Sequence, residues 1–292
     1  MSTYNGEKFL KKQLQSILNQ INVEVRLVIR DDGSNDRTLE YLGDLPQKIE
    51  VEYGEKNIGT IRSLRTLIQK RYHDEYLAFA DQDDIWEIDH LSKSVTEMKN
   101  NVGFAPCMTF PLYRLIDDLD NEITVRPKRI FVNLENSLVE NPAIGCGIVL
   151  NPGAAEILSS LPLSETVALD QQIYFLMSLL AKVVQGNTIG VNYRLHTNNL
   201  VGIRKNVIWI LPSAKTLGTL RKFRDAQQGL YLLYKGVLPL ADKKGFSKVD
   251  RHFNSVRGNW VQKIGYGLKP TFRREKLVDQ LLIKAALILG IL

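Results

Sequence analysis

The sequence has little cysteine, no apolar leader and no long hydrophobic run. Among its 292 residues only Cys107 and Cys146 are cysteines. Two are too few for a disulfide framework and lack metal-ligand spacing, so we expect a reducing compartment. The chain does not open with a charged segment followed by an apolar one, so no secretion leader is expected. No run reaches the roughly 18 apolar residues of a membrane-spanning helix, because Leu281–Leu292 is short and carries Lys284.

The composition excludes disordered, collagen-like and low-complexity chains, since 44% of residues are hydrophobic and 24% are charged. The net charge of +6 hides an uneven distribution. Residues 203–292 hold 18 Lys or Arg against 5 Asp or Glu, whereas residues 1–202 hold 20 against 27. An acidic first part and a basic last part indicate two domains with different partners, 1–202 and 203–292.

The first 200 residues alternate between short apolar runs and helical patterns, which is typical of an α/β sheet. Strands are predicted at Val23–Ile29, Ile49–Tyr53 and Tyr76–Ala80, and helices at Glu7–Gln20, Ile58–Lys70 and Gln171–Ala181.

Two of the predicted strands end in clusters of carboxylates. We name these the first acidic turn, Asp31–Asp36, and the second acidic turn, Asp81–Asp84. Because ligands of α/β sheets bind beyond the carboxyl ends of strands, the clusters predict a pocket for Mg²⁺ or Mn²⁺ carrying a phosphate. Asp31 and Asp32 fit ordinary turn chemistry equally well. The second acidic turn follows a buried strand without an apparent structural partner, and function is favoured there.

Several motifs, in order along the chain, resemble glycosyltransferase family 2 with its GT-A fold. They are Thr3-Tyr4-Asn5-Gly6 (the N-terminal turn), Asp31-Asp32-Gly33-Ser34, Ala80-Asp81-Gln82-Asp83-Asp84-Ile85-Trp86, Gly145-Cys146-Gly147, which resembles a small-residue strand, Asp170, and Tyr193-Arg194-Leu195-His196 with Asn199, Val201 and Gly202. The resemblance covers roughly residues 1–202, and the wording of the second acidic turn is most similar to bacterial surface-polysaccharide enzymes, often rhamnosyltransferases.

The resemblance implies a nucleotide site at Thr3, Tyr4, Asp32 and Asp81. Tyr4 would stack on the pyrimidine ring, and Asp32 would accept the N3–H of the base. Taken alone, Tyr4 could be a half-buried aromatic side chain instead.

The resemblance also implies a cation site and a general base. Asp81 and Asp83 form the D-x-D element, with Asp83 as the direct ligand of Mg²⁺ or Mn²⁺ and His196 as a second contact. Asp170 would take the proton from an acceptor hydroxyl. Outside its motif His196 would more simply be a core histidine. A helix-capping aspartate would look the same in the sequence as Asp170, although catalysis is favoured there.

The start of the chain departs from the family pattern. Relatives begin with an apolar strand of about 5–6 residues, whereas only Met1 and Ser2 precede Thr3 here. We therefore expect the first strand of the sheet to be missing and the nucleotide site to be less stable.

The basic region 203–292 is mainly helical by pattern and contains no nucleic-acid-binding signature, so nucleic acid is not an expected partner. Basic residues interleaved with apolar ones suit a helix on an anionic membrane, with Leu277–Leu292 entering the interface. A helical cap on the first domain, or a dimer surface, fits the pattern equally well. We expect a cytoplasmic protein, peripheral at the inner face of the cell membrane.

Taken together, the sequence predicts an inverting, metal-dependent glycosyltransferase. Its donor would be a nucleotide diphosphate sugar, dTDP-rhamnose or a UDP-hexose, and its acceptor a surface glycan or lipid-linked saccharide. Two alternatives stay open. A nucleotidyltransferase would use a similar sheet but needs a glycine-rich basic loop, and Thr3–Lys12 offers only Gly6. The chain could also be a carbohydrate- or partner-binding GT-A module that has lost activity.

Overall fold

The computed structural model describes residues 1–46, 49–126, 132–196, 214–235, 243–268 and 277–289. The chain forms two compact units, each of which is discontinuous in sequence. Unit 1 comprises Met1–Pro127, Ala143–Glu165 and Val184–Ile203; unit 2 comprises Lys128–Pro142, Thr166–Val183 and Arg204–Leu292. The boundary near residue 202 that we expect from the charge distribution stays a prediction.

A small parallel sheet in unit 1 carries the first acidic turn. Its order is β1 (Ser2–Thr3), β2 (Val28–Asp31) and β3 (Glu50–Tyr53). Thr3 lies opposite Asp31, and Asp31 lies opposite Tyr53. The expectation of a missing first strand is therefore wrong, because two residues suffice for parallel pairing: the Met1 carbonyl accepts from Arg30 at 3.0 Å and the Thr3 carbonyl from Asp32 at 2.8 Å.

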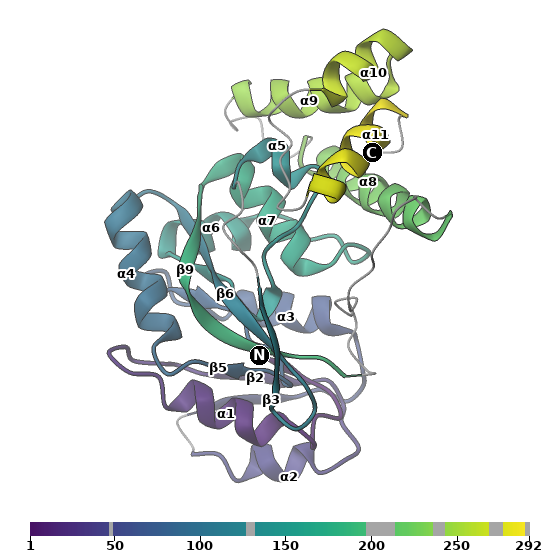
Figure 1. Ribbon diagram of the computed structural model, residues 1–292. Helices are drawn as coiled ribbons and strands as arrows, with labels where there is room; N and C mark the ends of the chain where they lie inside the picture. The colour runs from purple at the N-terminus through teal and green to yellow at the C-terminus, as the bar shows by residue number, and fades with distance from the viewer. Residues whose placement is uncertain (47–48, 127–131, 197–213, 236–242, 269–276, 290–292) are drawn as a thin grey trace. The chain divides into compact units, whose positions relative to one another are not determined.

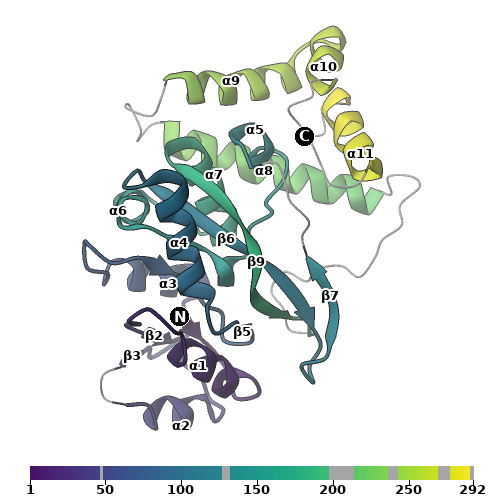
Figure 2. The same cartoon turned by 60° about the vertical axis from the view of Figure 1, so that its left-hand side comes forward.

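The second sheet of unit 1 contains several antiparallel strand pairs and carries the second acidic turn. Its order is β4 (Leu77–Ala78), β8 (Val149–Leu150), β6 (Cys107–Ile116), β9 (Lys182–Arg194) and β5 (Ile85–Trp86), with β7 (Glu122–Arg126) paired to β6. The second acidic turn joins β4 to β5. Figures 1 and 2 show the long strands β6 and β9 curving side by side through this sheet. The predicted α/β sheet is thus mixed.

Helices of unit 1 cover the sheets with their apolar faces. In α1 (Leu10–Leu18) the buried residues Leu10, Leu14 and Ile17 repeat at helical spacing. They share a core with Ile29 of β2 and Trp86 of β5. The remaining helices of this unit are α2 (Thr38–Gly43), α3 (Thr60–Ile68), α4 (His90–Val102), the 3₁₀ helix η1 (Gly145–Gly147) and α6 (Pro152–Ser160).

Unit 2 is helical and gathers α5 (Leu134–Ser137), α7 (Leu169–Leu180), α8 (Ala214–Lys235), α9 (Lys243–Arg257), α10 (Trp260–Gly267) and α11 (Leu277–Ile288). Its segments are joined by buried contacts: the Gln227 side chain of α8 donates to the Ser137 carbonyl of α5 at 2.6 Å. Within the described residues, no helix has the length and apolar character to cross a membrane.

Candidate functional site

Reciprocal hydrogen bonds fasten the N-terminal turn to the first acidic turn. The Asn5 N–H donates to Ser34 Oγ at 2.9 Å, and the Asn35 N–H donates to Asn5 Oδ1 at 2.9 Å. The Gly6 N–H donates to Thr38 Oγ1 at 2.7 Å. Asn5 adopts a φ of 47°, a left-handed conformation that asparagine tolerates better than most residues. The two turns thus form one rigid structure at the ends of β1 and β2.

Asp31 organises this structure from inside. Its carboxylate accepts from Thr3 Oγ1 at 2.9 Å, from the Ser34 N–H at 2.8 Å and from Ser34 Oγ at 2.6 Å. Gly33, with a φ of 82°, also donates its N–H to Asp31. Asp31 therefore has the turn role that its sequence context allows. The Thr3 hydroxyl serves the same turn, and its role toward a nucleotide stays a prediction.

Asp32 is buried beside Arg30 and is held by the loop after β3. Its oxygens each accept from the Ile58 N–H at 3.0 Å, and Oδ2 accepts from the Gly59 N–H at 2.8 Å. Arg30 forms an ion pair with Oδ1. Burial raises the pKa of Asp32, but the hydrogen bonds from Ile58, Arg30 and Gly59 outweigh it and hold the pKa below its usual value. Binding of a nucleotide base by this ionised group stays a prediction.

Gln82 connects the second acidic turn to the N-terminal turn. Its Oε1 accepts from the Tyr4 N–H at 2.9 Å, and its Nε2 donates to the Tyr4 carbonyl at 3.0 Å. A Cβ at Gly6 would lie 2.5 Å from Gln82 Oε1, so a larger residue there would displace the Gln82 side chain from its present position. The Tyr4 side chain stays 44% exposed, which leaves its ring available for stacking. Sequence reasoning missed Gln82, whose type carries no signal at the middle of a D-x-D motif.

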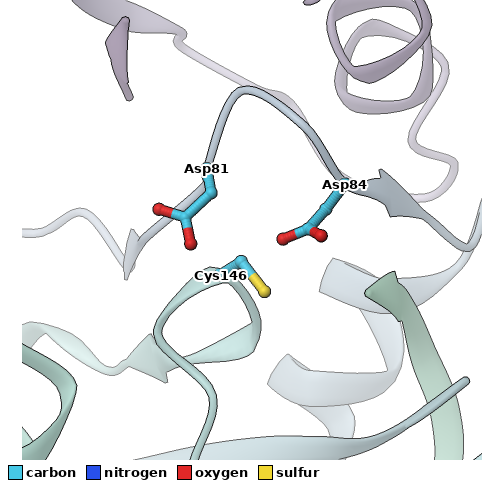
Figure 3. Close-up of side chains that lie close together, drawn as sticks. All are labelled: Asp81, Asp84 and Cys146. Carbon is cyan, nitrogen blue, oxygen red and sulfur yellow. The ribbon is translucent and has the colours of Figure 1, made fainter. Parts of the chain in front are cut away.

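A buried acidic cluster lies under the second acidic turn. Figure 3 shows Asp81 and Asp84 directed from the two ends of the turn toward Cys146 of η1, with ligand atoms within 4.8 Å of one another. Asp84 Oδ1 accepts from the Arg194 N–H at 2.9 Å, while Asp84 Oδ2 has no hydrogen-bond partner of nitrogen or oxygen among the described residues. Burial, and then the charges of Asp83 and Asp81, raise the pKa of Asp84 well above its usual value. Burial and Asp84 likewise raise the pKa of the Cys146 thiol.

Asp83 points to another partner, His196. Asp83 Oδ2 and His196 Nε2 are 2.7 Å apart, and both side chains are partly buried. The Phe9 ring lies 5.2 Å from the His196 ring, between centroids. The buried Arg194 donates from Nε to the Asp83 carbonyl at 2.7 Å and so fixes the turn from β9. Asp83 and Asp84 thus have structural partners that their sequence context does not reveal.

The residues of this turn fit a divalent cation. Asp83 offers a carboxylate oxygen beside the imidazole nitrogen of His196. Asp81 and Asp84 form a second group with Cys146, in which Asp84 Oδ2 has no nitrogen or oxygen partner among the described residues. Carboxylate with imidazole suits Mn²⁺, whereas Mg²⁺ prefers oxygen alone. The buried thiol of Cys146 is not a ligand that either ion favours.

Asp170 belongs to unit 2, where it lies in the first turn of α7. Its Oδ1 accepts from the Gln171 N–H at 2.8 Å. Burial raises the pKa of Asp170, against hydrogen bonds from Gln171 and Asn141 that lower it. A raised pKa suits a carboxylate that must accept a proton. The role of Asp170 as general base stays a prediction.

The Gly145–Gly147 motif differs from the predicted strand, and part of the C-terminal motif lies outside the described residues. The segment Gly145–Gly147 forms a 3₁₀ helix and not a strand; the Gly147 N–H donates to the Ile144 carbonyl at 3.1 Å, which closes a helical turn before β8. Its Cys146 carbonyl accepts from Trp86 Nε1 at 2.8 Å. Asn199, Val201 and Gly202 lie outside the described residues.

Residues 1–138 match the family described as Glycosyl transferase family 2. The dTDP-rhamnosyl transferase RfbG of Shigella flexneri is 33% identical over 104 residues, which are 32% of this chain and 35% of that protein. The UDP-Glc:alpha-D-GlcNAc-diphosphoundecaprenol beta-1,3-glucosyltransferase WfgD of Escherichia coli is 30% identical over 154 residues, 50% of this chain and 56% of that protein. The matches thus span between about a third and just over half of these relatives.

Solved structures resemble the whole chain. The crystal structure of S. aureus TarS 1-349 in complex with UDP-GlcNAc has a TM-score of 0.55 and 17% identity, and covers 100% of this chain and 80% of that one. The same protein without ligand gives a TM-score of 0.56 at 17% identity, over 98% of this chain and 79% of that one. At this identity the likeness concerns the fold, and it confirms the predicted GT-A architecture with a helical C-terminal region.

Proposed function

We propose that this chain, which belongs to glycosyl transferase family 2 through residues 1–138, is an inverting, cation-dependent glycosyltransferase. It moves a sugar from a nucleotide diphosphate donor onto a glycan or lipid-linked acceptor of the bacterial surface. The observation that carries this proposal is the hydrogen-bonded junction of three turns. Gln82 joins the second acidic turn to Tyr4, and Asn5 joins Tyr4's turn to the first acidic turn.

The donor nucleotide binds at this junction. Tyr4 stacks on the base, and Asp32, Thr3 and Asp81 line the nucleotide side of the site. Among the relatives, RfbG is named for a dTDP-linked donor and WfgD for a UDP-linked one, and TarS was solved with UDP-GlcNAc. The donor class of this chain is therefore a dTDP- or UDP-sugar, with rhamnose as one candidate sugar.

Asp83 and His196 hold the divalent cation, and Mn²⁺ suits their donor atoms better than Mg²⁺. When bound there, the cation supplies charge neutralisation at the leaving diphosphate. Arg194 and Phe9 keep Asp83 and His196 in place through the contacts described above, so the site is preorganised before the donor arrives.

Asp170 acts as the general base. It takes the proton of the acceptor hydroxyl as that oxygen attacks the anomeric carbon, and the bond from this carbon to the diphosphate oxygen breaks in the same step. A single displacement inverts the configuration at this carbon and forms no sugar–enzyme intermediate. The pKa of Asp170, raised by burial, favours its task as a proton acceptor.

The basic unit 2 suits a protein that works at the inner face of the cell membrane, where lipid-linked acceptors are found. Residues 203–292 hold 18 Lys or Arg against 5 Asp or Glu, and anionic lipid attracts such a surface.

A turnover assay tests the enzymatic proposal. UDP-glucose, UDP-GlcNAc and dTDP-rhamnose are incubated with the protein and Mn²⁺, and release of the nucleotide diphosphate is followed with and without a lipid-linked saccharide. Asp83→Asn should lower turnover at least about 100-fold. Asp170→Asn should lower it about 100-fold or more while donor binding persists. Asp118→Asn is the matched control, because this aspartate is exposed and pairs only with Lys8 among the described residues.

An Asp83→Asn variant that turns over donor as fast as the wild type would contradict the proposal. Donor binding without turnover in the unmodified protein would indicate a binding module instead.

A further inference from the structure

Helix α10 turns apolar side chains toward solvent. Trp260 is 72% exposed, Val261 57% and the following Leu268 59%. At 100° per residue, positions 260, 261, 264 and 268 fall on one side of the helix, and Ile264 between them is only half-buried. A surface helix of a globular protein normally turns such a stripe inward. We name these four residues the α10 face.

The opposite side of α10 is packed into unit 2, which fixes the orientation of the helix. Tyr266 is buried in a cluster with Ile283, Ala286 and Leu287 of α11. Its hydroxyl lies 3.1 Å from His252 Nδ1 of α9. Asn259 and Gln262 form a capping box at the start of the helix. The α10 face is therefore held outward by the fold and cannot turn inward without breaking this cluster.

The sequence around the α10 face is basic. From position 251 to 268 the sequence contains Arg251, Arg257 and Lys263 and no Asp or Glu. Both arginines are exposed. The preceding Asp250 is engaged by Tyr231 and by Lys235 at 3.1 Å. An exposed tryptophan beside valine and leucine, on a helix that carries Lys263 and follows Arg257, is the pattern of a segment at a lipid–water interface.

We propose that the α10 face inserts into the interface of an anionic lipid membrane, with Arg257 and Lys263 on lipid phosphates. An enzyme with a lipid-linked acceptor needs a membrane-binding surface, and only this need rests on the proposed function. The expectation that Leu277–Leu292 enters the membrane stays a prediction. Helix α11 buries Ile283, Ala286 and Leu287 within unit 2, while Leu281 and Leu289 are exposed.

Vesicle binding without donor or acceptor tests the α10 face independently of catalysis. The full-length protein is floated with vesicles of phosphatidylglycerol and phosphatidylcholine, and separately with phosphatidylcholine alone. The triple variant Trp260→Ala, Val261→Ser, Leu268→Ser removes the exposed apolar groups. The matched control is Phe104→Ser, since Phe104 is a fully exposed aromatic residue of unit 1. Thermal unfolding checks that every variant is folded.

Trp260 also reports its own environment. The chain has three tryptophans, of which Trp86 is buried. The measurement uses the variant Trp209→Phe, so that the vesicle-dependent change in emission comes from Trp260. We expect a blue shift with anionic vesicles, and at least about a tenfold loss of partitioning in the triple variant. Arg257→Gln and Lys263→Gln should each weaken partitioning about fivefold at low salt.

Equal flotation of the triple variant and the wild type, or equal loss in Phe104→Ser, would overturn the proposal. A wild-type protein that does not bind anionic vesicles would also overturn it. So would a wild-type dimer that is lost in the triple variant, because the α10 face would then be a dimer interface. Turnover on a water-soluble acceptor should be the same in the triple variant and the wild type, so failure of the membrane surface and failure of the enzyme are distinguished.

Discussion

At the scale of single residues, the site depends on side chains that bind the protein's own backbone. Gln82 pairs with both the N–H and the carbonyl of Tyr4, and Asp31 gathers Thr3 and Ser34. These contacts leave the Tyr4 ring exposed while its backbone is fixed. A preformed stacking residue costs less entropy when a nucleotide binds.

Replacing Gln82 should therefore weaken nucleotide binding without touching the nucleotide. Gln82→Ala removes both hydrogen bonds to Tyr4, and we expect the Kd for the bound nucleotide to rise about 5- to 20-fold, as for the loss of about 1–2 kcal/mol. Gln69→Ala is the control, because this glutamine makes a single exposed bond to the Ser159 carbonyl. Calorimetry that gives the same Kd for Gln82→Ala and wild type would show that Tyr4 needs no such support.

The sequence predicts the acidic and aromatic members of the site but not their supports. Asp83 and His196, 113 positions apart, meet as their motifs suggest. The N–H groups of Ile58 and Gly59 that hold Asp32 could not be predicted, since every non-proline residue carries one. Gln82 was missed for a related reason: its role depends on where a distant backbone passes.

At the scale of elements, Asn151 joins a helix to a sheet. It is the N-cap of α6, where its Oδ1 accepts from the Ala154 N–H at 3.0 Å. The same oxygen accepts from the Cys107 N–H at the start of β6 at 2.9 Å, and Nδ2 donates to the Ala105 carbonyl at 2.8 Å. This buried side chain thus makes three hydrogen bonds between two elements.

Asn151→Ala should lower the free energy of unfolding by about 2–3 kcal/mol, because a cap is lost and buried backbone groups are left unpaired. Asn101→Ala should lower it by less than about 0.5 kcal/mol, since the exposed Asn101 only donates to the Glu97 carbonyl of its own helix. Urea unfolding followed by circular dichroism compares the two. A change as small at Asn151 as at Asn101 would contradict the assignment.

The bounds of helices and strands were predicted unevenly: Ile49–Tyr53 matches β3 within one residue, whereas other elements differ more. The apolar spacing of Glu7–Gln20 and Ile58–Lys70 locates α1 and α3, which are a few residues shorter than predicted. The strand predicted at Val23–Ile29 instead covers Val28–Asp31. Its register explains the difference, since the strand begins where Val28 meets Glu50 of β3. A β-branched run cannot show where its partner starts.

At the scale of the whole molecule, the two units each bury a histidine. Burial lowers the pKa of His90 in unit 1 and of His252 in unit 2 to about 3. Both are neutral in the folded protein at neutral pH. An unfolded chain binds protons at these sites below a pH of about 6.5, so acid favours unfolding.

The stability of unit 2 should therefore decrease as the pH falls below about 6.5. At pH 5, protonation of His252 in the unfolded chain should lower the free energy of unfolding by about 2 kcal/mol. In the folded protein this side chain stays unprotonated down to a pH near 3. His252→Gln should flatten this dependence between pH 7.5 and 5. His73→Gln, at an exposed position, should leave it unchanged. A His252→Gln profile as steep as that of the wild type, measured by urea unfolding, would contradict this assignment.

The domain boundary near residue 202 stays a prediction, and the charge distribution does not indicate that the second compact unit is discontinuous in sequence. Unit 2 also takes Lys128–Pro142 and Thr166–Val183 from the first 202 residues. These segments are held by contacts such as Tyr234 with Gln172, whose side-chain oxygens lie 3.5 Å apart, and by Gln227 on the Ser137 carbonyl. Composition averages neighbouring residues along the chain, so it cannot show which distant segments pack together.

The most direct test of the nucleotide and cation site is calorimetric titration of UDP and of dTDP into the full-length protein. It is carried out with Mn²⁺ and again with a chelator, for the wild type and for Asp83→Asn. We predict that the wild type binds at least one nucleotide with Mn²⁺, and that the chelator or Asp83→Asn weakens this binding at least about tenfold. Binding that is unchanged by both, or no binding of either nucleotide by the wild type, would contradict the account.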